Sequence, residues 1–219
     1  MIVSENLKKL NKELPNNVTL IAVSKTKPVS DLMEAYNAGQ RTFGENKIQE
    51  MEAKWQEMPK DVEWHMIGHV QRNKVKYMAP FVSLIHAVDS LKLLKEINKE
   101  AEKNKRSIDC LLQIKIAEED SKFGMNEADA AKLLASEEYR KLQNLNIVGL
   151  MGMATFTEDK KQISEEFQKL KKIYDRLKIL NPEFRILSMG MSGDYKIAIE
   201  NGSNMVRVGS AIFGERNYN

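Results

Sequence analysis

Val18-Thr-Leu-Ile-Ala-Val-Ser-Lys25, followed at once by Thr26, Lys27 and Pro28, is the stretch that decides the predicted fold. Its apolar, β-branched run predicts a buried strand. Pro28 stops a strand and suits the first turn of a helix, so a helix is expected to follow directly. The same order of strand and then helix recurs along the chain, and this order predicts a parallel sheet with helices outside it.

Eight segments have the short, apolar or β-branched composition of strands. They are Thr19–Lys25, Thr42–Glu45, Glu63–Gly68, Leu84–Val88, Asp109–Ile116, Ile147–Thr155, Ile186–Ser192 and Met205–Phe213. Between them lie segments with apolar residues every three or four positions, which predict helices. A parallel sheet of this kind is either a closed barrel or an open doubly wound sheet, and eight strands favour a (β/α)8 TIM barrel.

The two ends of the chain complete this prediction. Leu7, Leu10 and Leu14 have helical spacing, so a helix is expected before the first strand. Five residues follow Gly214, too few for an eighth helix of the usual kind after the last strand. We therefore expect the N-terminal helix to cover that gap and residues 1–219 to form one domain.

Composition excludes several classes of protein. The 34 Lys and Arg residues and 31 Asp and Glu residues are interspersed, without the basic block that predicts a nucleic-acid partner. Cys110 is the one cysteine, so no internal disulfide forms and a reducing compartment is expected. The first residues lack the apolar core of a signal peptide, and no apolar run of about 18 residues exists to span a membrane. The sequence thus predicts a cytoplasmic protein without a membrane segment.

Lys25 is the first candidate for chemistry, because it lies at the C-terminal end of a predicted strand, where barrel enzymes place their functional groups. Val23 and Lys25 share one strand face, so Lys25 is expected above the barrel interior that Val23 helps to fill. Partial burial lowers the pKa of a lysine and favours a nucleophilic amine able to form a Schiff base. Lys27, two residues further along, is predicted on the same face and is the competing candidate. The alternative interpretation of Lys25 is that it lies at a solvent-exposed strand end and has no chemical role.

Two glycine-serine loops follow the last two predicted strands. They are Met189-Gly-Met-Ser-Gly193 and Arg207-Val-Gly-Ser-Ala211. Gly193 and Gly209 permit close backbone approach, while Ser192 and Ser210 add hydroxyl donors, a combination suited to a phosphate. The loops after strands seven and eight are the recurring phosphate position of this barrel. A lysine facing such loops suggests pyridoxal 5′-phosphate (PLP).

Arg207 lies inside the apolar strand Met205-Val-Arg-Val-Gly209. An arginine in a barrel interior requires a partner, so it is expected to reach either an acidic residue or a bound ligand.

Other chemistry is disfavoured. His65 and His69 are not followed by the glutamate of a zinc motif and have no third ligand with telling spacing, so no metal site is predicted. Cys110 precedes two leucines and is interpreted as a small buried hydrophobe. A dinucleotide fingerprint and a Walker loop are absent.

Several ordered motifs carry a resemblance that runs almost end to end. They are Ala22-Val-Ser-Lys-Thr-Lys-Pro28, Phe43-Gly-Glu-Asn46, Trp64-His-Met-Ile-Gly68 with Gln71-x-Asn-Lys74, Ser121-Lys-Phe-Gly124, Gly149-Leu-Met-Gly-Met153, Leu187-Ser-Met-Gly-Met-Ser192 and Val206-Arg-Val-Gly-Ser-Ala-Ile-Phe-Gly214. The chain resembles the pyridoxal phosphate homeostasis proteins, also described as proline synthetase co-transcribed homologues. This family is a single-barrel branch related to the alanine racemase N-terminal domain, with a fold-type III PLP-binding barrel.

The resemblance implies which residues bind the cofactor. It places the Schiff base on Lys25, the phosphate on Ser192, Gly193, Gly209 and Ser210, Asn46 near the cofactor, and Arg207 at the pyridine nitrogen. An arginine does not give up its proton to that nitrogen, so the ring remains a weaker electron sink than one paired with a carboxylate. No catalytic residue is assigned.

The resemblance also separates two classes of function. Racemases of the related family carry a C-terminal β-domain that supplies a second base, whereas this chain stops at Asn219. We therefore expect a monomer that buffers PLP and delivers it, possible recipients being PLP-dependent apo-enzymes, without turnover. A racemase-like enzyme of narrow substrate range is the alternative, and a barrel for a different sugar phosphate is the third class. Lys122 is either a solvated loop lysine or an aid to cofactor exchange.

Overall fold

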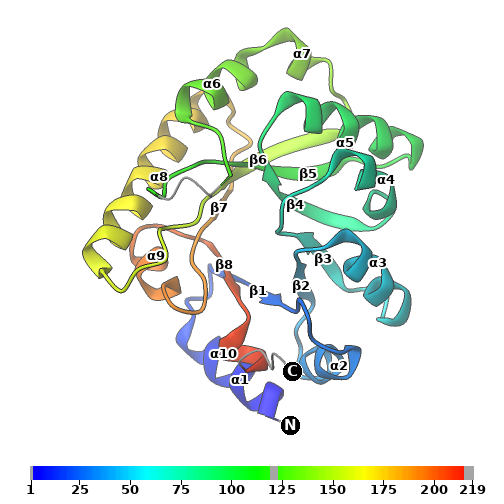
Figure 1. Ribbon diagram of the computed structural model, residues 1–219, viewed down its shortest axis with the longest axis vertical. Coiled ribbons are helices and arrows are strands. Elements are labelled where there is room, and N and C mark those ends of the chain that lie inside the picture. The colour runs from blue at the N-terminus through cyan, green and yellow to red at the C-terminus, as the bar shows by residue number, and fades with distance from the viewer. Residues whose placement is uncertain (1, 119–122, 215–219) are drawn as a thin grey trace.

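Eight parallel strands close on themselves in sequence order, with β1 beside both β2 and β8 (Figure 1). The computed structural model describes residues 2–118 and 123–214. The strands are β1 (Thr19–Val23), β2 (Thr42–Glu45), β3 (Glu63–Met66), β4 (Val82–Val88), β5 (Ile108–Gln113), β6 (Leu145–Met151), β7 (Ile186–Ser188) and β8 (Met205–Val208). The predicted (β/α)8 barrel is confirmed, and the doubly wound alternative is wrong.

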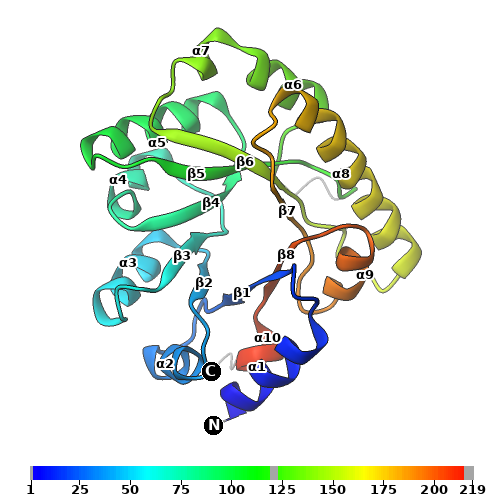
Figure 2. The same ribbon diagram turned by 180° about the vertical axis from the view of Figure 1, so that it is seen from behind.

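The helices lie around the outside of this ring of strands, as both views of the ribbon show (Figures 1 and 2). They are α1 (Ile2–Glu13), α2 (Val29–Asn37), α3 (Ile48–Glu57), α4 (Val75–Met78), α5 (Leu91–Lys103), α6 (Glu127–Ala135), α7 (Glu137–Arg140), α8 (Lys160–Leu180), α9 (Tyr195–Glu200) and α10 (Ser210–Phe213), with a 3-10 turn, η1, at Arg72–Lys74. In the described part of the chain, none of these helices is long and apolar enough to cross a membrane.

Local sequence accounts for where these helices begin and end. Ser90 precedes α5, and its hydroxyl accepts a hydrogen bond from the Leu93 amide at the N-cap. Gly39 follows α2 at φ +104°, and its amide donates to the Tyr36 carbonyl while the Gln40 amide donates to the Ala35 carbonyl. This pair of bonds is a Schellman motif, which favours glycine at the left-handed position.

The last predicted strand requires a correction. β8 ends at Val208, and the residues predicted to extend it form the short helix α10 instead. α10 buries Ile212 and Phe213 beside α1, and the Asn6 side-chain amide donates to the Ile212 carbonyl at 3.0 Å. Figure 1 shows the two helices next to each other. The N-terminal helix α1 therefore covers this side of the barrel as expected. It does so together with α10, the single helical turn that follows the last strand.

The barrel interior has an apolar and a polar part. The apolar cluster consists of Ile21, Leu84, Ala87, Leu111, Val148, Met151 and Met205. Two positions beyond Leu84 on β4 and Met205 on β8 lie His86 and Arg207, and Ser188 follows Ile186 in the same way on β7. Because side chains alternate with period two, these polar residues face the same interior, one step nearer the C-terminal ends of the strands.

Candidate functional site

A cavity of about 670 Å³ lies at the C-terminal ends of the strands. All seven predicted cofactor-binding residues line it, namely Lys25, Asn46, Ser192, Gly193, Arg207, Gly209 and Ser210. They come from the segments directly after β1, β2, β7 and β8 and from β8 itself. The structure thus brings together residues up to 185 positions apart in sequence, from Lys25 to Ser210, and their contact with a cofactor remains a prediction.

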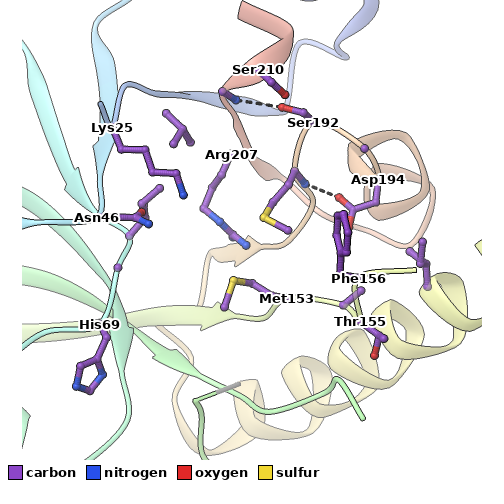
Figure 3. A pocket seen from close by; sticks show the side chains of 18 of the residues that line it. Lys25, Asn46, His69, Met153, Thr155, Phe156, Ser192, Asp194, Arg207 and Ser210 are labelled. Atoms are coloured by element: carbon purple, nitrogen blue, oxygen red, sulfur yellow. Dashed lines mark hydrogen bonds between the residues drawn. The ribbon is translucent and has the colours of Figure 1, made fainter. Parts of the chain in front are cut away.

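Lys25 reaches into this cavity from the end of β1, toward the region between Asn46 and Arg207 (Figure 3). Val23 lines the same cavity, but β1 ends at Val23, so the prediction that Val23 and Lys25 share a strand face is wrong although both side chains border the cavity. Lys27 also lines the cavity, but its Nζ donates to the Phe213 carbonyl of α10 at 2.8 Å. This bond directs the competing amine toward α10.

The loops after β7 and β8 are tied to each other. The Gly209 amide after β8 donates to Ser192 Oγ after β7 at 3.2 Å (Figure 3). Within the loop after β7, the Met191 amide donates to Asp194 Oδ1 at 2.5 Å. A Cβ built on Gly193 would meet no atom within 4 Å, so the backbone there borders open space. A Cβ on Gly209 would come within 3.3 Å of Val23, so this glycine also serves the close approach of β8 to β1.

Arg207 is buried and makes two hydrogen bonds inside the barrel. Its Nη1 donates to Ser188 Oγ at 2.6 Å, and its Nη2 donates to the Gly152 carbonyl at 3.1 Å. Of the two partners expected for Arg207, the acidic one has a counterpart in Asp194, whose charge acts on the guanidinium, and contact with a bound ligand stays a prediction. Burial lowers the pKa of Arg207 to about 10 while the Asp194 charge raises it, so the guanidinium stays protonated at neutral pH.

A buried chain of hydrogen bonds continues from Arg207 across the barrel. Ser188 Oγ lies 3.1 Å from His86 Nδ1, and His86 Nε2 lies 3.0 Å from His65 Nδ1. Because arginine only donates, the Ser188 hydroxyl accepts from Arg207, whereas the direction of its bond with His86 Nδ1 depends on the tautomer of His86. His86 and His65 share one hydrogen bond between Nε2 and Nδ1, so Arg207, Ser188 and the two histidines form one connected polar chain.

Both histidines of the polar chain are neutral at ordinary pH. Burial lowers the pKa of His65 to about 3. Burial lowers the pKa of His86 well below its usual value, and the charges of His65 and Arg207 act in the same direction. Sequence analysis overlooked His86 and Ser188. Strand alternation could have identified them, because each lies two residues after an inward-facing apolar residue of a predicted strand.

The disfavoured chemistries can be placed as well. His65 belongs to the polar chain, whereas His69 stacks on Phe123 with ring centroids 4.6 Å apart, so the two histidines do not share a site. Within residues 2–118 and 123–214, no three His, Cys, Asp or Glu side chains are grouped as a metal ion would require. Burial raises the pKa of Cys110 and confirms it as a core residue. Lys122 lies outside the described residues.

Comparisons with known proteins agree on one family. Residues 3–217 match the family model described as alanine racemase, N-terminal domain. A curated pyridoxal phosphate homeostasis protein of Vibrio alginolyticus is 41% identical over 209 residues, which cover 93% of this chain and 89% of that protein.

Two solved structures of PipY from Synechococcus elongatus PCC7942 superimpose on 97% of this chain and 100% of theirs. The one described as without PLP has a TM-score of 0.91 at 36% identity, and the one with PLP bound has 0.88 at 35% identity.

Proposed function

The chain belongs to the family of pyridoxal phosphate homeostasis proteins, and from this premise we propose that it binds pyridoxal 5′-phosphate at the C-terminal end of its barrel. One observation carries the proposal: an amine, a buried guanidinium and two glycine-serine loops line one cavity of about 670 Å³. This volume is typical of small-molecule sites, which combine apolar walls with a few convergent polar groups.

The residues of the cavity fit this group. When bound, the cofactor supplies an aldehyde that reacts with an amine and a ring that withdraws electrons. Lys25 Nζ supplies the amine for a Schiff base, and Asn46 offers an amide beside it. The open backbone at Gly193 and the hydroxyls of Ser192 and Ser210 suit a phosphate dianion, because hydrogen bonds to a charged acceptor are stronger than neutral ones.

Arg207 supports a carrier without catalytic turnover. Its guanidinium keeps its proton at neutral pH, so it can donate a hydrogen bond to a pyridine nitrogen but does not transfer a proton to it. A ring nitrogen facing it stays unprotonated and stabilises a carbanion poorly, so carbon acidity at a bound amino acid is weak. We accordingly propose storage and delivery of the cofactor in preference to a racemase-like reaction. Delivery to PLP-dependent apo-enzymes, a monomeric state and a cytoplasmic location remain predictions.

The decisive experiment maps the covalent bond. Purified protein is mixed with the cofactor, reduced with borohydride and digested, and the modified lysine is identified by mass spectrometry. We expect modification of Lys25, loss of the visible absorption band in Lys25→Ala, and retention of the band in the matched variant Lys27→Ala. An adduct on Lys27 would refute the assignment of the lysine, and a protein that stays colourless would favour a barrel for a different phosphate ester.

A second experiment separates carrier from enzyme. The loaded protein is incubated with each common L-amino acid in D2O, and Cα deuterium and the D-enantiomer are followed by NMR and chiral chromatography. A carrier gives no sustained exchange. Multiple turnovers that disappear in Lys25→Ala would establish the racemase-like alternative.

A further inference from the structure

Lys25 lies in a tight turn that is strained. The Lys27 amide donates to the Ser24 carbonyl at 3.0 Å, which closes a four-residue turn with Lys25 and Thr26 at its centre. Thr26 has φ +64°, whereas the φ of Lys25 is negative. The pattern is that of a type II turn, whose third position favours glycine or asparagine. A β-branched residue at positive φ is rare, so the surroundings must hold this turn in place.

Three charged side chains hold the turn from both sides of Lys25. Lys54 Nζ, on α3, donates to the Ser24 carbonyl at 2.8 Å. Glu50 Oε1, one helical turn earlier on α3, accepts from the Thr26 amide at 2.6 Å. Glu45 Oε1, at the end of β2, accepts from Ser24 Oγ at 2.6 Å. The backbone on either side of Lys25 is therefore fixed by groups outside the turn.

The same three side chains are bonded to one another. Lys54 Nζ lies 2.7 Å from both Glu45 Oε1 and Glu50 Oε1, so its three hydrogens have three acceptors. We call Glu45, Glu50 and Lys54 the ion cluster. It links the end of β2, the helix α3 and the turn after β1 in one network.

Burial shows that this arrangement carries a free-energy cost. Lys54 is 5% exposed and Glu45 is fully buried, and the second carboxylate oxygen of Glu45 is buried without a partner among the described residues. Burial raises the pKa of Glu45 while Lys54 acts against it. Buried ion pairs contribute little to the free energy of unfolding, because apolar residues of similar volume stabilise a protein equally well or better. Their value here lies in the fixed geometry of the bonds they make to the turn.

We propose that Glu45, Glu50 and Lys54 are positioning residues for Lys25, which hold a strained turn so that the lysine amine points into the cavity. This inference rests on the proposed function, in which Lys25 bonds the cofactor. None of the three residues lines the cavity, so each acts through the turn and not by touching a ligand.

The test uses Glu50, because its side chain is partly exposed and its loss leaves Glu45 and Lys54 paired. In Glu50→Ala the Thr26 amide loses its acceptor and the strained turn is released. We expect formation of the Lys25 adduct, followed by stopped-flow absorbance after adding pyridoxal 5′-phosphate, to slow by about tenfold or more, since displacing a reacting group by about 1 Å costs on the order of 10²-fold. Binding of pyridoxine 5′-phosphate, which has no aldehyde, should be unchanged.

Two rescue variants distinguish positioning from general damage. Glu50→Gln retains an acceptor for the Thr26 amide and should recover most of the rate. Thr26→Gly, combined with Glu50→Ala, lets the turn adopt φ near +64° without strain and should also restore the rate. Glu57→Ala, at an exposed position of the same helix, is the matched control and should behave as the wild type.

The outcomes separate the two proposals. A slow Glu50→Ala that both rescue variants restore supports the positioning role. An unchanged rate in Glu50→Ala, beside a normal wild-type adduct on Lys25, overturns the positioning role and leaves the proposed function intact. A slow rate that neither variant restores, with weaker binding of pyridoxine 5′-phosphate, assigns the cluster a purely structural role and also overturns it. A wild type that forms no adduct on Lys25 removes the proposed function and this inference together.

Discussion

The apolar cluster and the polar chain occupy the same barrel yet differ in what holds them. Leu84 and Met205 are packed by neighbours that need no fixed orientation, whereas His86 and Arg207, two positions further along the same strands, depend on directed bonds. Packing tolerates changes of shape if volume is kept, but a buried hydrogen-bond chain fails when one member is lost. Within one interior, the apolar cluster therefore stabilises the fold, and the polar chain above it orients Arg207.

The largest effect on the free energy of unfolding is expected in the apolar cluster. Leu111→Ala deletes a fully buried side chain and should lower stability by about 2–5 kcal/mol, through lost apolar transfer and the cavity left behind. Urea unfolding measures the loss. Because Leu111 does not line the functional cavity, the folded variant should still form the Lys25 adduct; a folded variant without it would mean that the two layers are not separable.

A smaller loss with a functional consequence is expected from Ser188→Ala. The variant removes the acceptor of Arg207 Nη1 and the hydrogen-bond partner of His86 Nδ1, so stability should fall by about 1–3 kcal/mol. Cofactor retention on dialysis should fall as well, because Arg207 loses its orientation. Ser203→Ala is the control, since it removes a buried hydroxyl that lies within hydrogen-bond distance of the backbone carbonyls of Leu187, Met189 and Met205 and should leave retention unchanged. Equal retention in both variants would contradict the role given to the polar chain.

Acid should weaken the polar chain before the apolar cluster. His65 has a folded pKa of about 3 against 6.5 in the unfolded chain, so the unfolded state binds more protons between these values. This contribution to stability is therefore present well above pH 6.5 and falls as the pH drops, by about 1 kcal/mol for His65 between pH 6.5 and 5.5, and the lowered pKa of His86 acts in the same direction. Urea midpoints measured over this range test the slope. His65→Asn should reduce the slope, because it removes one of the two buried histidines.

The smallest effect on folding is expected at the rim of the cavity. Ser210 is exposed at the start of α10, so Ser210→Ala should change stability by less than about 0.5 kcal/mol. Loss of one hydrogen bond to a phosphate should nevertheless weaken cofactor binding by about 1.5–3 kcal/mol. Equilibrium dialysis measures this change, with Ser30→Ala as a control at an exposed serine of α2. Identical affinities in the two variants would place the phosphate elsewhere.

Local sequence predicted the fold and the rim of the site better than the interior contacts. Strand composition, helical periodicity and the loops after the last two strands are local features, so the barrel, Lys25 and the two glycine-serine loops followed from them, whereas Asn46 came from the family resemblance. The polar chain joins β3, β4, β7 and β8, and the ion cluster joins β2 to α3, so each depends on packing across the fold. Lys54 illustrates the difference, because a lysine on a predicted helix is ordinarily solvent-exposed.

The cationic lining of the cavity has a consequence for how fast a ligand arrives. Lys25, Lys27 and Arg207 face the cavity with Asp194 as the opposing carboxylate. A recess with excess positive charge and low-dielectric walls focuses the field outward and raises the rate of encounter with a dianion. Dissolved ions screen this attraction over about 10 Å at 0.1 M ionic strength. Association of a phosphate ester should therefore slow as salt is added, while its dissociation, governed by the hydrogen bonds of the two serine loops, changes much less.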